Sequence, residues 1–188
     1  DAGEFGFSGG MFINAGCAHF VSVQSDLYAL QPVIAHETTH ALLAHLPLPA
    51  WLNEGLAVNT EQRLCPRPIN PTAPRPTPQQ MHQRHQKFWG DDEVQEFWSG
   101  KSFLRSDEGN ELSYDMARIL VSQFSMDWPA FVSFANAASM DDAGHAAARE
   151  HLGIDLGLAM AAVLEREAGP SLAPDAARWT SEPERGGF

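Results

Sequence analysis

The spacing of apolar residues changes along the chain, from short runs near its start to helical repeats further on. Residues 10–13 and 18–23 are short, β-prone segments separated by the turn-like sequence Asn14-Ala15-Gly16, which predicts an antiparallel hairpin. Beyond this hairpin, apolar residues recur every three or four positions, as in amphipathic helices. Strands followed by helices predict an α+β fold with a mainly helical C-terminal half.

Helices are the most numerous predicted elements. A proline is accepted in the first turn of a helix but not in its interior, so the first helix is expected to run from near Pro32 to about Leu46. A second helix is expected from Trp51 to about Leu64, with an apolar stripe that starts at Trp51. Further helices are predicted over residues 79–88, 112–124, 129–138, 142–152 and 156–168.

The 188 residues are expected to form a single domain. Residues 65–78 read CPRPINPTAPRPTP, and six prolines in this stretch predict an extended loop without helix or strand. The predicted parts are therefore a strand and motif-helix part over residues 10–64, the proline-rich loop, a helical part over residues 79–168, and a fraying tail over residues 169–188.

Candidate chemistry is concentrated in the first predicted helix, which contains the sequence HETTH. His36 and His40 are four residues apart, so on a helix their imidazoles lie on the same face. Two imidazoles so placed can both bind one zinc ion (Zn²⁺), and Glu37 can take a proton from a metal-bound water. A catalytic zinc site needs a third protein ligand and one open position, and Glu54 in the second helix is the candidate.

The segments HETTH and WLNEGLA, within residues 33–58, resemble the metal-binding helices of gluzincin zinc metallopeptidases. The resemblance is in particular to compact bacterial domains of the peptidase-MA type. WLNEGLA also resembles the third-ligand helix of zinc aminopeptidases, although the interval from His40 to Glu54 is shorter than in that branch. The resemblance implies that His36, His40 and Glu54 bind zinc and that Glu37 is the general base. It also implies a zincin-like fold, with a small antiparallel or mixed sheet packed on the HExxH helix.

Two further roles follow from the same resemblance. Gluzincin-like enzymes supply a Tyr or His from a later helix to stabilise the oxyanion, and Tyr114 is the candidate, with a merely packed tyrosine as the alternative. In some gluzincins an acid one turn after the third ligand orients a zinc-binding histidine. Val58 occupies that position here, so Asn59 and Glu61 are the possible substitutes.

Composition narrows the range of partners. The formal net charge of −12 disfavours nucleic acid, whose phosphates would be repelled. No apolar run reaches about 18 residues, so no membrane span is predicted. Cys17 and Cys65 are the only cysteines, and a disulfide and two free thiols both remain open.

The predicted function is zinc-dependent hydrolysis of peptide bonds in protein or peptide substrates. Endopeptidase action is favoured, because zinc aminopeptidases hold the substrate amine with a Gly-rich strand that ends in Glu-Asn. Residues 9–14 contain the glycines and Asn14 but no Glu. The alternatives are an aminopeptidase, a non-catalytic zinc-containing binding module with a peptidase fold, and a core helix in which HETTH binds no metal.

Overall fold

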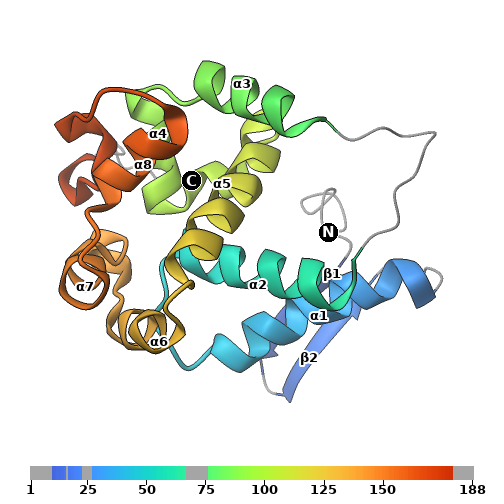
Figure 1. Cartoon of the computed structure of the whole chain (residues 1–188). Helices are drawn as coiled ribbons and strands as arrows, with labels where there is room; N and C mark the ends of the chain where they lie inside the picture. Colours follow the sequence, from blue (N-terminus) through green and yellow to red (C-terminus); the bar gives the residue numbers. More distant parts are fainter. Residues whose placement is uncertain (1–9, 16, 23–26, 67–75, 180–188) are drawn as a thin grey trace, which may run out of the picture.

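The computed structural model of the chain describes residues 10–15, 17–22, 27–66 and 76–179 (Figure 1). Most of these residues are helical, and the helices pack around a shared core of apolar side chains. The long helix α5 (Glu108–Phe124) runs through the molecule and contacts α2 (Ala50–Leu64), which in turn contacts α1 (Leu27–Leu43). The two helices that carry the predicted metal ligands, α1 and α2, therefore lie next to each other.

The β structure in the described ranges is limited to one hairpin. Strands β1 (Gly10–Ala15) and β2 (Cys17–Ser22) pair antiparallel, with Gly10 opposite Ser22 and Ala15 opposite Cys17. Both strands contact α1. The hairpin is thus a small attachment to the motif helix.

The predicted α+β fold class, with a zincin-like sheet packed on the HExxH helix, is wrong, because the fold is helical. The hairpin contains only two strands, and a two-stranded ribbon is too small to form an independent layer. The core of apolar side chains that the structure describes comes from helices and their connections. The β-prone pattern of the first residues therefore extends no further than the hairpin, and helical periodicity determines the architecture.

The remaining helices of the described ranges pack on the same apolar core as α2 and α5. They are α3 (Pro78–Phe88), α4 (Asp91–Ser99), α6 (Trp128–Ala137), α7 (His145–Ala147), which continues as a π-helical turn (Ala148–Leu152), and α8 (Leu156–Leu164). Short 3-10 turns occur at Lys101–Leu104, Met140–Asp142, Pro170–Leu172 and Ala176–Arg178. Within the described ranges, none of the helices has both the length and the apolar character needed to cross a bilayer.

Several helix boundaries differ from the prediction. Helix α1 ends at Leu43 and includes Pro32 in its interior, although it was expected to start near that proline. Helix α5 begins at Glu108 because the side chain of Asp107 caps it, accepting a hydrogen bond from the backbone of Gly109 at 2.9 Å. Helix α4 was not predicted, and its acidic first turn favours the helix through the macrodipole. The second helix is confirmed at Ala50–Leu64.

The described residues after α8, up to Trp179, pack against the helices more closely than expected. Leu172 is buried, and its carbonyl accepts a hydrogen bond of 2.9 Å from Nε1 of Trp98. Nε2 of Gln95 donates to the carbonyls of Ser171 and Ala173, both at 2.8 Å. The predicted fraying tail is therefore wrong for its described residues, up to Trp179. The rest of that tail and residues 67–75 of the proline-rich loop lie outside the described ranges.

Trp51 anchors the start of α2 in the core. Its side chain is fully buried and packs edge-on against Trp98 and Phe124. Its Nε1 donates a hydrogen bond of 3.0 Å to the carbonyl of Ala143. Because Glu54 follows three residues later on the same helix, this anchor fixes the position of the candidate third ligand.

Gly55 allows α2 to approach α5 closely. A Cβ atom at Gly55 would lie 2.6 Å from the carbonyl oxygen of Ala117 and 2.6 Å from Cγ2 of Val121. Because one of these contacts is with backbone, the helices would have to separate. We expect Gly55→Ala to lower the free energy of unfolding by about 1–3 kcal/mol, measured by urea unfolding of the metal-free protein.

Helix propensity alone predicts that Gly55→Ala would raise the free energy of unfolding, since Ala is favoured over Gly inside a helix by about 1 kcal/mol. The control is Gln62→Ala on the exposed end of the same helix, which should stay within about 0.5 kcal/mol of the parent. A Gly55→Ala protein as stable as the parent would show that the close approach of α2 and α5 is not required.

Candidate metal centre

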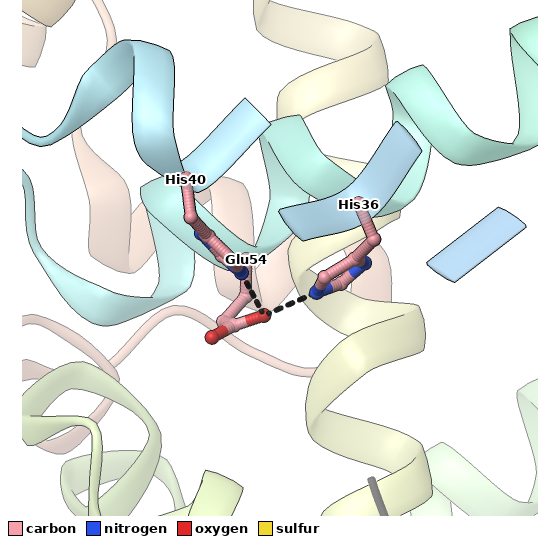
Figure 2. A group of neighbouring side chains, drawn as sticks. All are labelled: His36, His40 and Glu54. Carbon is pink, nitrogen blue, oxygen red and sulfur yellow. Dashed lines mark ion pairs between the residues drawn. The ribbon is translucent and has the colours of Figure 1, made fainter. Parts of the chain in front are cut away.

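His36 and His40 lie on one face of α1, as their four-residue spacing predicts. Their ring centroids are 4.7 Å apart and the ring planes meet at 78°. The two side chains are largely buried, with 16% and 17% of their surface exposed. Figure 2 shows both rings directed toward the same carboxylate, that of Glu54.

Helix α2 supplies that carboxylate. Oε2 of Glu54 lies 3.2 Å from Nε2 of His36 and 3.5 Å from Nε2 of His40 (Figure 2). Two helices joined by a short connection therefore bring together three side chains that are up to 18 residues apart in the sequence. The sequence prediction for these three residues is confirmed as a group that could hold a metal ion.

The separations within this group fit a metal ion. Ligand atoms about 2.0–2.1 Å from a tetrahedral ion are about 3.3 Å from one another. The two measured nitrogen–oxygen separations, 3.2 and 3.5 Å, lie on either side of that value. In addition, Oε2 of Glu54 is buried but makes no hydrogen bond of acceptable geometry. A cation between the three atoms would satisfy this buried oxygen, which otherwise carries a desolvation cost.

The side chains of the group shift one another's pKa values. Burial lowers the pKa of His36, but the facing carboxylates of Glu54 and Glu61 outweigh it and raise the pKa to about 9. The pKa of His40 is also raised, because Glu54 outweighs the effect of burial. Burial raises the pKa of Glu54, and the two imidazoles outweigh it and lower the pKa to about 2. The protonated imidazole of His36 therefore places a positive charge beside the carboxylate of Glu54.

Metal binding is expected to depend on pH because protons compete for the same nitrogens. With a pKa of about 9, His36 holds a proton at neutral pH and must release it to a metal ion. The apparent zinc affinity should therefore rise at least about tenfold per unit between about pH 7 and pH 8, and level off above the pKa of His36. Competition with a chromophoric chelator at several pH values measures this slope. An affinity that does not change between those pH values would contradict the assignment.

The outward nitrogens of the two imidazoles also face oxygen atoms of α2. Nδ1 of His36 lies 3.4 Å from Oε2 of Glu61, and Nδ1 of His40 lies 3.1 Å from Oδ1 of Asn53. Of the two substitutes suggested by the sequence, Glu61 is therefore the one beside a histidine. Asn59 instead donates to the carbonyls of Gly55 and Arg118, at 2.8 and 3.0 Å. Sequence reasoning missed Asn53, whose only signal was its position next to Glu54.

The two predicted catalytic residues lie at the same site. Glu37 follows His36 on α1, and its side chain is only 8% exposed. The ring centroid of Tyr114, from α5, is 6.4 Å from that of His36. Burial raises the pKa of Tyr114, and the negative charges of Glu54 and Glu37 raise it further, so both carboxylates are close enough to affect the phenol. Because α5 begins earlier than expected, Tyr114 lies in its second turn.

Other histidines are engaged elsewhere. His45, at the end of α1, has its Nδ1 2.9 Å from the carbonyl of Leu42. The buried His85 accepts a hydrogen bond at Nδ1 from Nε1 of Trp89, at 2.8 Å, and its Nε2 lies 2.9 Å from Oδ2 of Asp115. Since indole nitrogen only donates, His85 must carry its proton on Nε2. Both of its nitrogens are therefore used in packing α3 against α5.

Comparison with known proteins provides no second line of argument. No protein-family model matches the chain, and no curated protein or solved structure matches it either. Any function must therefore be inferred from the residues of the metal centre and their geometry.

Proposed function

We propose that this chain is a zinc metallopeptidase of the gluzincin type, which hydrolyses peptide bonds in proteins or peptides. The observation that supports the proposal is the convergence of His36, His40 and Glu54 on one point, with the buried Glu37 beside them. Two imidazole nitrogens and one carboxylate are a ligand set typical of catalytic zinc, which keeps one position open. A structural zinc site would instead use four protein ligands.

Zinc is the proposed ion because imidazole and carboxylate ligands in a tetrahedral arrangement suit it. When bound, zinc would lower the pKa of its water to about 7 and polarise the substrate carbonyl. His36, His40 and Glu54 would hold the ion, and all three side chains are largely buried. The short connection between α1 and α2 keeps the three ligands in position.

We assign to Glu37 the proton transfers of peptide hydrolysis, as the general base and then the general acid. It leaves α1 about 100° around the helix axis from His36, so its carboxylate would lie beside the ion without being one of the ligands. A carboxylate in this place can accept the proton of the attacking water and then donate it to the leaving amine. Its electrostatic effect on Tyr114 indicates that both side chains border the same reacting region.

Tyr114 is assigned to the oxyanion that develops on the scissile carbonyl. Its raised pKa keeps the phenol protonated, as a hydrogen-bond donor must be. Its ring packs against Phe103, with centroids 5.2 Å apart, which holds the side chain in place beside His36.

Removing this donor should slow turnover without loss of zinc. We expect Tyr114→Phe to lower kcat by about 10²-fold, the effect of losing one oxyanion donor, while the bound zinc stays at the parent level. Peptide hydrolysis and metal analysis of the same sample measure both quantities. Unchanged turnover would remove Tyr114 from the mechanism and leave it a packing role against Phe103.

Cleavage within chains is proposed in preference to removal of N-terminal residues. An aminopeptidase needs acidic side chains to bind the free amine of its substrate, and the segment at residues 9–14 has no Glu. Substrates blocked at both ends should therefore be cleaved as well as free peptides.

The test is a digest of a blocked peptide library by the zinc-loaded protein. We expect internal cleavage that a chelator abolishes and added zinc restores. A protein that carries one zinc ion per chain but cleaves no peptide would contradict the proposed activity and favour a zinc-containing binding module. Cleavage of free peptides alone would favour an aminopeptidase.

A further inference from the structure

We propose that Ser113 and Asp115, the neighbours of Tyr114 on α5, are positioning residues that aim the phenol of Tyr114 at the metal centre. The proposal deepens the role assigned to Tyr114 and rests on the proposed function. Successive residues of a helix leave its axis about 100° apart, so these three side chains point in three directions. Tyr114 is the one that lies beside His36, with ring centroids 6.4 Å apart.

Ser113 joins α5 to the 3-10 turn at Lys101–Leu104. Its hydroxyl oxygen lies 2.7 Å from that of Ser102, within hydrogen-bond distance, and both side chains are fully buried. Phe103, the next residue of the turn, packs edge-on against Tyr114, with the ring planes at 88°. The turn therefore holds Tyr114 in two ways, through its neighbour on the helix and through its own ring.

Asp115 joins another side of α5 to α3. Its Oδ2 lies 2.9 Å from Nε2 of the buried His85, and its Oδ1 accepts a hydrogen bond of 2.7 Å from Nη2 of Arg118. The ring of His85 is itself fixed, because its Nδ1 accepts from Nε1 of Trp89 at 2.8 Å. Burial raises the pKa of Asp115, but His85 and Arg118 outweigh it and lower the pKa, which keeps the carboxylate charged at neutral pH.

Hydrogen bonds in these two directions fix the rotation of α5 about its axis. Apolar side chains in the same places would permit a range of rotations, whereas a hydrogen bond requires a defined direction. A helix with its side chains is about 10–12 Å across, so a rotation of about 10° moves the end of a side chain by about 1 Å. A misplacement of that size can cost about 100-fold in turnover. The aim of Tyr114 therefore depends on two bonds that it does not itself make.

The experiment is a double-mutant cycle with Tyr114→Phe, in which kcat, KM and zinc content are measured. Asp115→Ala removes the bond to His85, and we expect kcat to fall about tenfold while KM and bound zinc stay at the parent level. In the Tyr114→Phe background the same change should have no effect on kcat, because the hydroxyl that it misplaces is gone. Ser102→Ala, which removes the bond to Ser113, should show the same coupling. Equal losses of kcat in both backgrounds would overturn the positioning role, as would parent-level kcat in Asp115→Ala and Ser102→Ala.

Two control variants accompany the cycle. Asp115→Asn keeps an oxygen that can accept from His85, so its kcat should stay within about threefold of the parent. Gln123→Ala changes an exposed residue of the same helix and should leave kcat unchanged. A loss in Gln123→Ala equal to that in Asp115→Ala would overturn the assignment, because the effect would then not depend on the bond to His85.

NMR of the metal-free chain with isotope-labelled tyrosine gives a readout that needs no catalysis. Tyr28 is the only other tyrosine, so Tyr114→Phe identifies the signals of Tyr114. The ring of Phe103 lies against Tyr114 and shifts its ring resonances, so Asp115→Ala should change these shifts and Gln123→Ala should not. An unchanged Tyr114 spectrum in Asp115→Ala would overturn the positioning. If the parent cleaves no peptide, the proposed function fails, and the NMR result alone decides whether Asp115 positions Tyr114.

Discussion

Glu37→Gln is expected to lower peptide hydrolysis by about 10²- to 10⁴-fold, the contribution usual for a positioned acid or base. The amide has nearly the same shape as the carboxylate, so the buried side chain of Glu37 should still fit. An amide cannot accept the proton of the attacking water or return it to the leaving amine. Because Glu37 is not among the three converging ligands, the bound zinc should remain at the parent level.

The measurement compares kcat and zinc content of parent and variant, prepared in the same way. Glu167→Gln makes the same chemical change at an exposed position and should leave both values unchanged. Hydrolysis by Glu37→Gln at the parent rate would show that another group moves the proton. Loss of zinc along with activity would show instead that Glu37 belongs to the ligand set.

Glu54→Ala is expected to have the largest effect on metal binding. Glu54 supplies the single oxygen that faces both Nε2 atoms, at 3.2 and 3.5 Å, and no other carboxylate in the described ranges completes such a group. Loss of a direct ligand should cost more than loss of an outer partner, so we expect zinc affinity to fall by more than about 100-fold. Hydrolysis should disappear in parallel.

Glu54→Ala also tests the electrostatics of the metal-free site. Glu54 is the main cause of the raised pKa of His40 and contributes strongly to that of His36. Both pKa values should therefore fall in the variant, as measured by NMR titration of the imidazoles. Zinc affinity equal to that of the parent would contradict the assignment of the third ligand.

The two histidines of the group that could hold a metal ion were predictable from sequence, because their spacing is a local property. A spacing of four positions from His36 to His40 places two imidazoles on one helix face whatever the surrounding fold. The prediction of Glu54 as the third ligand was less direct, since its position beside the histidines depends on how the two helices pack. The prolines after α1 and the apolar Trp51 indicated a short turn and a buried start to the second helix, and both features are present.

The fold class was harder to predict because it depends on contacts distant in sequence. The two β-prone segments do pair with each other, but whether further strands join them cannot be read from these segments alone. Helix α4 was not predicted, although three acids at a helix N-terminus are favourable. The segment at residues 171–173 lacked periodicity, since side chains of α4 hold it through backbone carbonyls.

Asn53 shows a different limit of sequence reasoning. An asparagine within a helix has many possible partners, and nothing in the local pattern indicated His40. Glu61 was considered because the expected acid was replaced by Val58, which required an acceptor from elsewhere on α2. Its contact with His36 depends on the relative rotation of α1 and α2, which only the structure provides.

Anomalous diffraction at the zinc absorption edge, from crystals grown with zinc, tests the central claim most directly. We expect one strong peak per chain, about 2.0–2.2 Å from Nε2 of His36, Nε2 of His40 and a carboxylate oxygen of Glu54. The fourth position should be free of protein ligands. The absence of a peak between these three side chains at saturating zinc, or a fourth protein ligand closing the site, would contradict the account.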